Sequence, residues 1–439
     1  MLKNALFRST VIISLFFAVD KLVGLIRQYL VIKQFGMSAV ADAFNVSNNI
    51  PDWMASLVVS GLTIAIIPVF NREASKNGTK SAWILFMNIS NIAVFFTSII
   101  ALIIGIFAVP IIHSPLGVAP GLNSDNQLLV IQLMQLNLIA AVIFTAGSLI
   151  TAGLQANKSF LLPAIAPSFH ALGQIFGVLV LAPSMGIFGL AYGVIIGAIL
   201  NLLIQLPGLF HFKLRWNFRI NFHQEGLREI GSLLGVRALT VFLIYLMFYI
   251  RDNMASHMQT GSISALTYAW TAVQLPETLI GTALGTALYP TISEQIASKK
   301  YGEAIKTLQN SARILIGITV PIIIFSFFLL QPILEFILPF IKIQLNIAIF
   351  TQVTLAFMVG LTGQCVLEIV ARSYYAIQKQ VIYLWANVGR VIIFLGISIV
   401  TINLNNPVYL ALADSIAVTG MVIVLWIILI KKLHKHYQN

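Results

Sequence analysis

The chain has 439 residues, of which 59% are hydrophobic and only 9% charged, and its mean hydropathy is +0.93. A soluble domain carries about 45–50% apolar and about 25% charged residues, so this composition excludes a soluble globular protein and indicates a polytopic membrane protein. The net charge of +12 does not indicate nucleic-acid binding, because the basic residues lie mostly between hydrophobic runs. A single cysteine, Cys365, excludes an internal disulfide and a cysteine-cluster metal site.

Twelve hydrophobic segments follow one another along the chain, and each is long enough for a helix to cross a hydrocarbon core about 30 Å thick. We expect the first segment to be retained rather than removed as a signal peptide. Asp20, Lys21 and Arg27 interrupt it, and no small-residue cleavage site follows it. The twelve predicted spans are residues 10–32, 41–70, 81–109, 127–154, 159–182, 186–211, 227–251, 262–296, 304–330, 346–376, 380–402 and 408–430.

The loops between these spans alternate sharply in basic charge. One set contains 19 cations and the other contains three, namely Lys33, Arg251 and Lys342. Because loops rich in Lys and Arg stay in the cytoplasm, this asymmetry predicts that both termini are cytoplasmic, and the even number of spans agrees. The basic set is Lys3, Arg8, Arg72, Lys76, Lys80, Lys158, Lys213, Arg215, Arg219, Arg228, Lys299, Lys300, Lys306, Arg313, Arg372, Lys379, Lys431, Lys432 and Lys435.

Short patterns of the first half recur in the second half at nearly the same offset. They are two residue-proline pairs, at 50–51 and 67–68 and again at 275–276 and 289–290, and a polar turn at 155–158 and again at 376–379. Because six is an even number of spans, two halves of six would keep the same orientation, related by an axis along the membrane normal. The sequence therefore predicts two six-helix lobes with a substrate path between them.

This duplication also predicts the domain boundaries. We expect an N-terminal lobe at 1–211 and a C-terminal lobe at 227–439, joined by a cytoplasmic linker at 212–226 that contains Phe212-Lys213-Leu214-Arg215-Trp216. Lobes of this kind typically carry a substrate by moving against each other.

Charged residues inside the predicted spans are candidates for function, since a charge at the bilayer centre costs about 2.5–3.5 kcal/mol and needs a partner or a watery cavity. Asp20 and Arg27 share one stripe of the first span, whereas Lys21 lies about 100° away. These residues either form a structural ion pair or line a cationic cavity for an anionic head group, and arginine suits phosphate. The charged residues are Asp20, Lys21, Arg27, Arg237, Glu277, Glu368 and Arg390, with Asp414 shallower and Arg251 and Asp252 at the outer end of span seven.

The roles of the other charged residues stay open between structure, gating and ion coupling. Arg390 is a second candidate for binding an anion, and Glu368 either pairs with Arg390 or takes a coupling proton or Na⁺. We interpret His170 as a hydrogen-bonded packing residue rather than a proton relay. The residues we consider for gating or ion coupling are Asp20, Arg237, Arg251, Asp252, Glu277 and Glu368.

The sequence contains no P-loop, nucleophile elbow or paired catalytic carboxylates, and its histidines lack metal-ligand spacing. We therefore expect a transporter rather than an enzyme, with no cofactor or metal. Its energy source would be an ion gradient, the membrane potential or downstream consumption of the product.

Several motifs resemble the MurJ/MviN family of lipid II flippases. In the first half they include Val23-Gly24-Leu25-Ile26-Arg27, Ala41-Asp42-Ala43-Phe44 and Ile67-Pro68-Val69-Phe70, and in the second half Gln274-Leu275-Pro276 and the stretch 371–376. The resemblance covers nearly the whole chain. It implies the multidrug/oligosaccharidyl-lipid/polysaccharide exporter fold, in which two six-helix lobes surround a central cavity. It also implies transport of the lipid-linked peptidoglycan precursor across the bacterial cytoplasmic membrane.

The resemblance carries over only some of the family's cavity charges. It assigns Lys21, Arg27 and Asp42 to the binding or gating of the pyrophosphate. Either Arg237, Arg251 or Arg390 compensates for the family charges that are replaced, or the substrate differs. Lys21 stands where the family usually has arginine, and the family commonly has fourteen spans where twelve are predicted here. Family charges are replaced at Gln28, Ala55, Ser56, Ser60, Trp270 and Thr271.

Three functions remain open on the sequence. The first is a flippase for a polyprenyl-pyrophosphate-linked glycan, most directly lipid II, with membrane lipids and cell-wall synthesis proteins as partners. The second is an ion-coupled exporter of cationic small molecules or of another lipid-linked oligosaccharide; a cationic cargo would need acidic residues such as Asp20, Asp42, Glu277 and Glu368. The third is a non-transporting scaffold for cell-envelope assembly.

Overall fold

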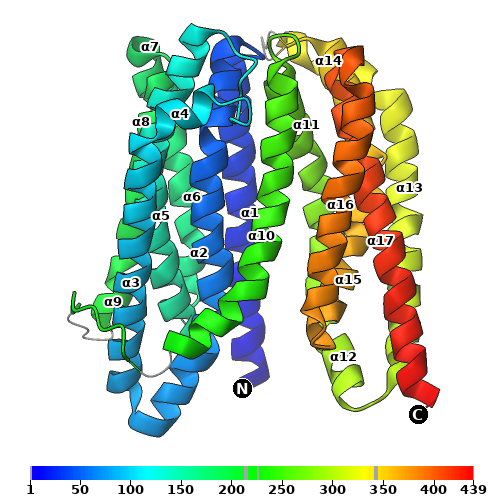
Figure 1. Cartoon of the computed structure of the whole chain (residues 1–439). Coiled ribbons are helices and arrows are strands. Elements are labelled where there is room, and N and C mark those ends of the chain that lie inside the picture. Colours follow the sequence, from blue (N-terminus) through cyan, green and yellow to red (C-terminus); the bar gives the residue numbers. More distant parts are fainter. Residues whose placement is uncertain (1, 158, 212–215, 225–226, 341–344, 439) are drawn as a thin grey trace. The chain divides into compact units, whose positions relative to one another are not determined.

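The chain folds into helices, as its composition predicts. The structure is a computed structural model that describes residues 2–157, 159–211, 216–224, 227–340 and 345–438 (Figure 1). These residues contain helices and no strand. They form two compact units, Met1–Tyr245 and Leu246–Asn439, which we call the N-terminal and the C-terminal unit. The boundary between the two units falls inside one helix. The lobe boundaries expected at 211 and 227 stay a prediction. Residues 212–215 and 225–226 of the expected linker lie outside the described residues.

The N-terminal unit consists of nine helices, one π-helical turn and the first part of a tenth helix within the described residues. They are α1 (Leu2–Phe35), α2 (Ala39–Asn77), α3 (Thr79–Ile106), α4 (Ala108–His113), α5 (Ser124–Ala156), α6 (Leu161–Phe176), η1 (Gly177–Leu181), α7 (Ala182–Met185), α8 (Ile187–Leu203), α9 (Leu206–His211) and α10 (Leu227–Ser256).

The C-terminal unit begins within α10 and also contains a π-helical turn. Its elements are α11 (Ser262–Pro276), η2 (Glu277–Thr282), α12 (Ala283–Ala297), α13 (Tyr301–Phe340), α14 (Ile347–Met358), α15 (Leu361–Ala376), α16 (Gln380–Thr401), η3 (Ile402–Leu404) and α17 (Pro407–Gln438).

Each of the twelve predicted spans falls on one helix or on a run of consecutive helices. Within the described residues, eight helices are long and apolar enough to cross a membrane, or nine if α14 and α15, bent by 41° at their junction, form one span. The membrane-spanning architecture is therefore confirmed, and the count of twelve spans stays a prediction.

The helix ends follow from short polar signals in the sequence. The Ser38 side chain accepts a hydrogen bond from the Ala41 amide at 3.2 Å and so caps α2, and Asn123 caps α5 through the Asn126 amide at 2.9 Å. With 39 residues, α2 is about 58 Å long, so it extends well beyond a hydrocarbon core about 30 Å thick.

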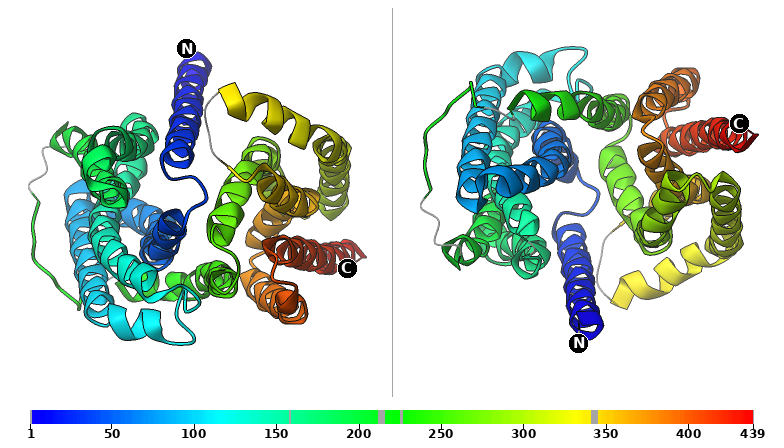
Figure 2. Two further views of the ribbon diagram at one scale, coloured as in Figure 1. Left: turned by 90° about the horizontal axis from the view of Figure 1, so that it is seen from above. Right: turned by 90° about the horizontal axis from the view of Figure 1, so that it is seen from below.

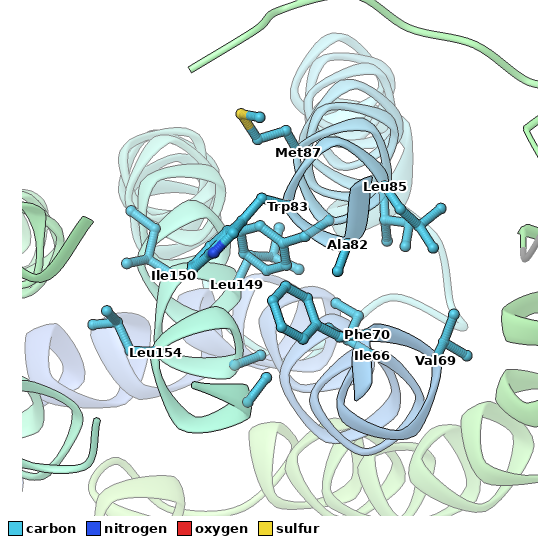
Figure 3. Packing of buried hydrophobic residues seen from close by; sticks show 14 of the residues in the cluster. Ile66, Val69, Phe70, Ala82, Trp83, Leu85, Met87, Leu149, Ile150 and Leu154 are labelled. Carbon is cyan, nitrogen blue, oxygen red and sulfur yellow. The ribbon is translucent and has the colours of Figure 1, made fainter. Parts of the chain in front are cut away.

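Buried aromatic rings join α2, α3 and α5 in the N-terminal unit (Figure 3). The Trp83 ring lies 5.3 Å, centroid to centroid, from both Phe70 and Phe86, in edge-on geometry. A Cβ at Gly153 of α5 would lie 2.6 Å from the Phe86 ring, so only glycine lets α5 pack this closely on α3. Figure 2 looks along these helices, and α2, α3 and α5 lie side by side.

A seam of glycines brings α6 against α8. A Cβ at Gly173 would lie 2.2 Å from the backbone nitrogen of Gly197, and one at Gly177 would lie 2.7 Å from the Cα of Gly193. Small residues four positions apart on two helices allow this close backbone approach in membrane proteins. Because α6 also packs against α1, this seam fixes the position of α6, the helix that faces the charged residues of α1.

Hydrogen bonds between helices hold the C-terminal unit together. The buried Tyr374 hydroxyl of α15 donates to the Leu425 carbonyl of α17 at 2.8 Å, and the Ser415 hydroxyl of α17 donates to the Ala356 carbonyl of α14 at 2.7 Å. Polar side chains in membrane proteins often bridge helices in this way, because lipid offers them no partner. These bonds fix the helices that carry the charged residues of this unit.

Candidate functional site

Arg27, on α1, is half-buried and is held by amides rather than by a carboxylate. Its Nη1 donates to Gln174 Oε1 of α6 at 3.1 Å, and its Nη2 donates to Gln28 Oε1 at 3.2 Å. Among the described residues it forms no ion pair, and Asp20 and Asp52 act on its charge only at longer range. Its buried Nε has no hydrogen-bond partner there. The guanidinium is therefore positioned by neutral amides, and no carboxylate among the described residues is paired with it.

Gln174 connects Arg27 to His170, one turn earlier on α6. Arginine only donates hydrogen bonds, so Gln174 turns its oxygen to Arg27 and its NH₂ group to His170 Nε2, 2.9 Å away. His170 Nε2 must then accept, which makes this imidazole neutral with its proton on Nδ1. The ring packs against Phe144 of α5 at 5.0 Å between centroids. This geometry agrees with His170 as a hydrogen-bonded packing residue.

Asp52, on α2, is a charged residue of this region that the sequence analysis did not single out. It is exposed and lies within electrostatic range of Arg27. One turn further along α2, the Ser56 hydroxyl lies 2.6 Å from the Tyr245 hydroxyl. The sequence did contain a signal for Asp52, because this acidic residue follows Pro51 within a predicted span. Gln174 gave a weaker signal, as a polar residue four positions after His170.

The other candidates of the N-terminal unit occupy different environments. Lys21 is exposed and lies close enough to Asp20 to act on its carboxylate, which is half-buried. Asp42 is only 2% exposed and lies in the first turn of α2, where its negative charge interacts favourably with the helix dipole. Asp20 and Arg27 thus lie on the same helix within electrostatic range of each other, without an ion pair, and Asp42 lies in the interior at a helix start. A binding role for Lys21 or Asp42 stays a prediction.

Arg390, in the C-terminal unit, is locked in a buried ion pair. Its Nη2 lies 2.7 Å from Asp414 Oδ1, which joins α16 to α17. The Asp414 side chain is 1% exposed. The alternative pairing of Arg390 with Glu368 is not the one that the structure shows. Arg390 therefore has a structural partner, and its role in anion binding stays a prediction.

Arg251 and Asp252 form a second buried pair, near the end of α10. Arg251 Nη2 lies 2.9 Å from Asp252 Oδ1, and the guanidinium lies over the Phe248 ring at 5.1 Å from its centroid. Arg237, two thirds of the way back along the same helix, is half-buried. The pairing favours a structural role for Arg251 and Asp252, and a gating role for these three residues stays a prediction.

Glu277 and Glu368 meet at a junction between η2 and α15. Arg372 forms an ion pair with Glu368 and also donates to Thr286 Oγ1 at 3.2 Å. Glu277 accepts hydrogen bonds from the hydroxyl of Thr282 at 3.0 Å and from that of Thr278 at 3.3 Å, and it lies within electrostatic range of Glu368. The structure therefore brings two carboxylates together around one guanidinium, which leaves one negative charge in excess.

Comparison with known proteins identifies relatives over most of the chain. The family model described as lipid II flippase MurJ matches residues 31–439. The lipid II flippase MurJ of Burkholderia cenocepacia is 27% identical over 424 residues, which cover 94% of this chain and 80% of that protein.

Solved structures share the fold. One described as lipid II flippase MurJ in an inward closed conformation superposes with a TM-score of 0.80 at 21% identity, over 98% of this chain and 90% of that one. An inward-facing multidrug resistance transporter of the MATE family in the MOP superfamily superposes with a TM-score of 0.79 at 12% identity, over 96% of both chains. The predicted all-α exporter fold is therefore confirmed.

Proposed function

Because the chain belongs to the MurJ family of lipid II flippases, we propose that it carries lipid II from the inner to the outer leaflet of the bacterial cytoplasmic membrane. The family match over residues 31–439 is the observation that carries this proposal. The membrane-spanning helices support it, since a flippase must work within the bilayer. The charge asymmetry of the loops supports cytoplasmic termini.

Arg27 would bind the pyrophosphate of the substrate. A guanidinium presents a fork of donors that matches two phosphate oxygens, and such charge-assisted bonds are stronger than neutral ones. In the N-terminal unit, Gln174 and Gln28 orient this fork without neutralising it. Asp52 would compete for Arg27 when no substrate is bound, because it lies within electrostatic range and is exposed. Movement of the two lobes would then carry the head group while the polyprenyl chain stays in lipid.

Purified chain reconstituted into vesicles with lipid II tests this function directly. We expect the chain to move lipid II between leaflets and to rescue growth of a bacterium depleted of its own flippase. Arg27→Ala should abolish rescue, whereas Lys379→Ala, an exposed loop residue, should rescue as the parent chain does. Absence of flipping by the parent chain would overturn the proposal and favour a scaffold. Export of cationic compounds without lipid II flipping would favour a small-molecule exporter.

Ion coupling would use the junction of Glu277, Glu368 and Arg372. An uncompensated charge is costly within a membrane, so the excess carboxylate favours uptake of a proton or Na⁺. The hydroxyls of Thr278 and Thr282 already face Glu277 and supply further oxygen atoms. We expect flipping by the parent chain to depend on pH or on Na⁺, and Glu277→Gln to remove that dependence. Unchanged dependence in Glu277→Gln would contradict the assignment of the coupling site, with the flippase function untouched.

A further inference from the structure

A strand-like segment, residues 216–222, lies along α3 in the N-terminal unit, and we call it the strap (Figure 1). Two asparagines of α3 bind its backbone. Asn88 exchanges two hydrogen bonds of 2.8 Å with the backbone of Asn221, and Asn91 Nδ2 donates to the Asn217 carbonyl at 2.7 Å. The Trp216 indole returns a bond to Asn91 Oδ1 at 2.9 Å. The strap is thus fixed to the N-terminal unit by its backbone and by Trp216.

The side chains of the strap alternate between apolar and polar. An extended chain sends alternate side chains to opposite sides, so the apolar residues share one side. Phe218 is 81% exposed, a large apolar surface that water would not favour. The apolar residues are Trp216, Phe218, Ile220 and Phe222, and the polar ones are Asn217, Arg219 and Asn221.

The length of α3 places the strap at a membrane interface. The helix has 28 residues, and about 20 residues cross the hydrocarbon core. If one edge of the hydrocarbon core lies at Ile106, the apolar end of the helix, then about 20 residues of helix bring the other edge to Met87. Met87 lies beside the two asparagines that bind the strap. Lys76 and Lys80, both exposed, lie beyond this point. Aromatic side chains favour such interfaces, and anionic lipid head groups attract the basic residues there.

A cavity of about 550 Å³ lies between the strap, α3, α5 and the α8–α9 region. This volume falls within the range of about 300–1,000 Å³ found for ligand pockets. Its walls are almost entirely apolar and include Leu149 and Ile150 of α5 and Phe218 of the strap. Such a cavity suits an acyl chain, because each buried CH₂ group gains about 0.8 kcal/mol.

Ser90 supplies a polar group within this lining. The residue is 1% exposed, and its hydroxyl has no hydrogen-bond partner among the described residues. A buried hydroxyl without a partner is unfavourable, so a ligand oxygen at this point would be stabilised. The ester carbonyl of a glycerophospholipid offers such an oxygen at the head of its acyl chain, whereas a polyprenyl chain has none.

We propose that the cavity beneath the strap binds one anionic glycerophospholipid, with an acyl chain against α5, its ester near Ser90 and its head group near Arg219. Arg219 lies on the polar side of the strap rather than in the cavity lining, and it is exposed, so its long side chain can supply positive charge to a head group at the interface. The residues that line this cavity do not include Arg27 or its two hydrogen-bond partners.

Native mass spectrometry of the full chain, titrated with dioleoyl phosphatidylglycerol, tests the site. We expect one tightly bound lipid, and about tenfold weaker binding for Ala146→Phe, which fills the cavity, and for Arg219→Gln. Arg219→Lys should bind as the parent chain does. Val142→Phe places the same bulk on α5 at a different groove and serves as the matched control.

Two outcomes would overturn the proposal. Equal binding by Ala146→Phe and the parent chain would show that the lipid does not occupy the cavity. Equal affinity for dioleoyl phosphatidylcholine, or preferential binding of undecaprenyl phosphate, would show that the site does not select an anionic glycerophospholipid. Thermal unfolding of each variant in detergent checks that it remains folded.

Discussion

Arg27 in the N-terminal unit and Arg390 in the C-terminal unit both lie in spans predicted from the sequence, yet their partners differ. Arg390 is buried against the Asp414 carboxylate at 2.7 Å, so the two charges cancel. Arg27 is half-buried, and its hydrogen bonds go to the neutral amides of Gln174 and Gln28. One region therefore uses its arginine to join two helices, whereas the other keeps a positioned positive charge.

This contrast shows that the partner of a membrane-embedded arginine, rather than its depth, indicates its role. A carboxylate partner compensates the charge and leaves little attraction for an anionic ligand. Amide partners fix the geometry of the guanidinium and leave its charge to attract phosphate. By this criterion Arg27 is the better candidate for a pyrophosphate ligand, and Arg251 resembles Arg390 because Asp252 lies 2.9 Å away.

The largest effect should come from breaking the Arg390 pair. Asp414→Ala leaves a buried guanidinium without its carboxylate, and loss of one partner of a buried pair costs about 3–5 kcal/mol of the free energy of unfolding. Chemical unfolding of the purified chain in detergent measures this loss. The double variant Arg390→Met with Asp414→Leu removes both charges and should recover most of the stability. If Asp414→Ala were as stable as the parent chain, the pair would not be structural.

Removal of the Arg27 side chain should affect transport more than folding. Arg27→Ala loses a charge-assisted contact of about 1.5–3 kcal/mol, which corresponds to about 10- to 150-fold slower flipping of lipid II in vesicles. Arg27→Lys should be intermediate, because lysine keeps the charge and lacks the fork. The free energy of unfolding should change much less than in Asp414→Ala. Full flipping activity of Arg27→Ala would contradict its role in binding.

Replacing Gln174 by glutamate should give Arg27 the kind of partner that Arg390 has. Gln174→Glu places a carboxylate where the amide oxygen now accepts from Arg27 at 3.1 Å. We expect about tenfold slower flipping, equivalent to about 1.4 kcal/mol, without a loss of stability. Gln174→Met, which is uncharged and similar in size, should slow flipping less. Faster flipping by Gln174→Glu than by Gln174→Met would argue against the importance of a free charge at Arg27.

The smallest effect should come from a carboxylate outside the membrane-spanning segments. Hydrogen bonds from Ser81 and Asn77 lower the pKa of Glu73 below its usual value of 4.5. Because the folded pKa is lowered, these bonds stabilise the fold above pH 4.5 and are lost as the pH falls through the lowered value. Ser81→Ala should therefore lower the melting temperature slightly at pH 7, and the decrease should become smaller as the pH falls below 4.5. A decrease that stays constant throughout an acid titration would show that Glu73 ionisation is not involved.

The fold was predictable from the sequence to a large extent, and the site only in part. Each hydrophobic run fell on one helix or on a run of consecutive helices, because apolar length is what a bilayer requires. Arg27 was identified from a charge within a span. Its partner Gln174 lies 147 positions away, so only the packing of α1 on α6 could reveal it. Likewise, Glu368 pairs with Arg372, four residues further along its own helix, and not with Arg390.

The positions of the helices and the membrane location of the chain follow from the amino-acid sequence alone, because these properties depend on local runs of side chains. The sequence also placed the arginines, but not the groups opposite them. Tertiary structure decided that Asp414 neutralises Arg390 and that amides hold Arg27. The physical reason is that Coulomb and hydrogen-bond energies depend on distances of a few ångströms between helices, which the close glycine contacts of α6 and α8 and the packing of α16 on α17 set.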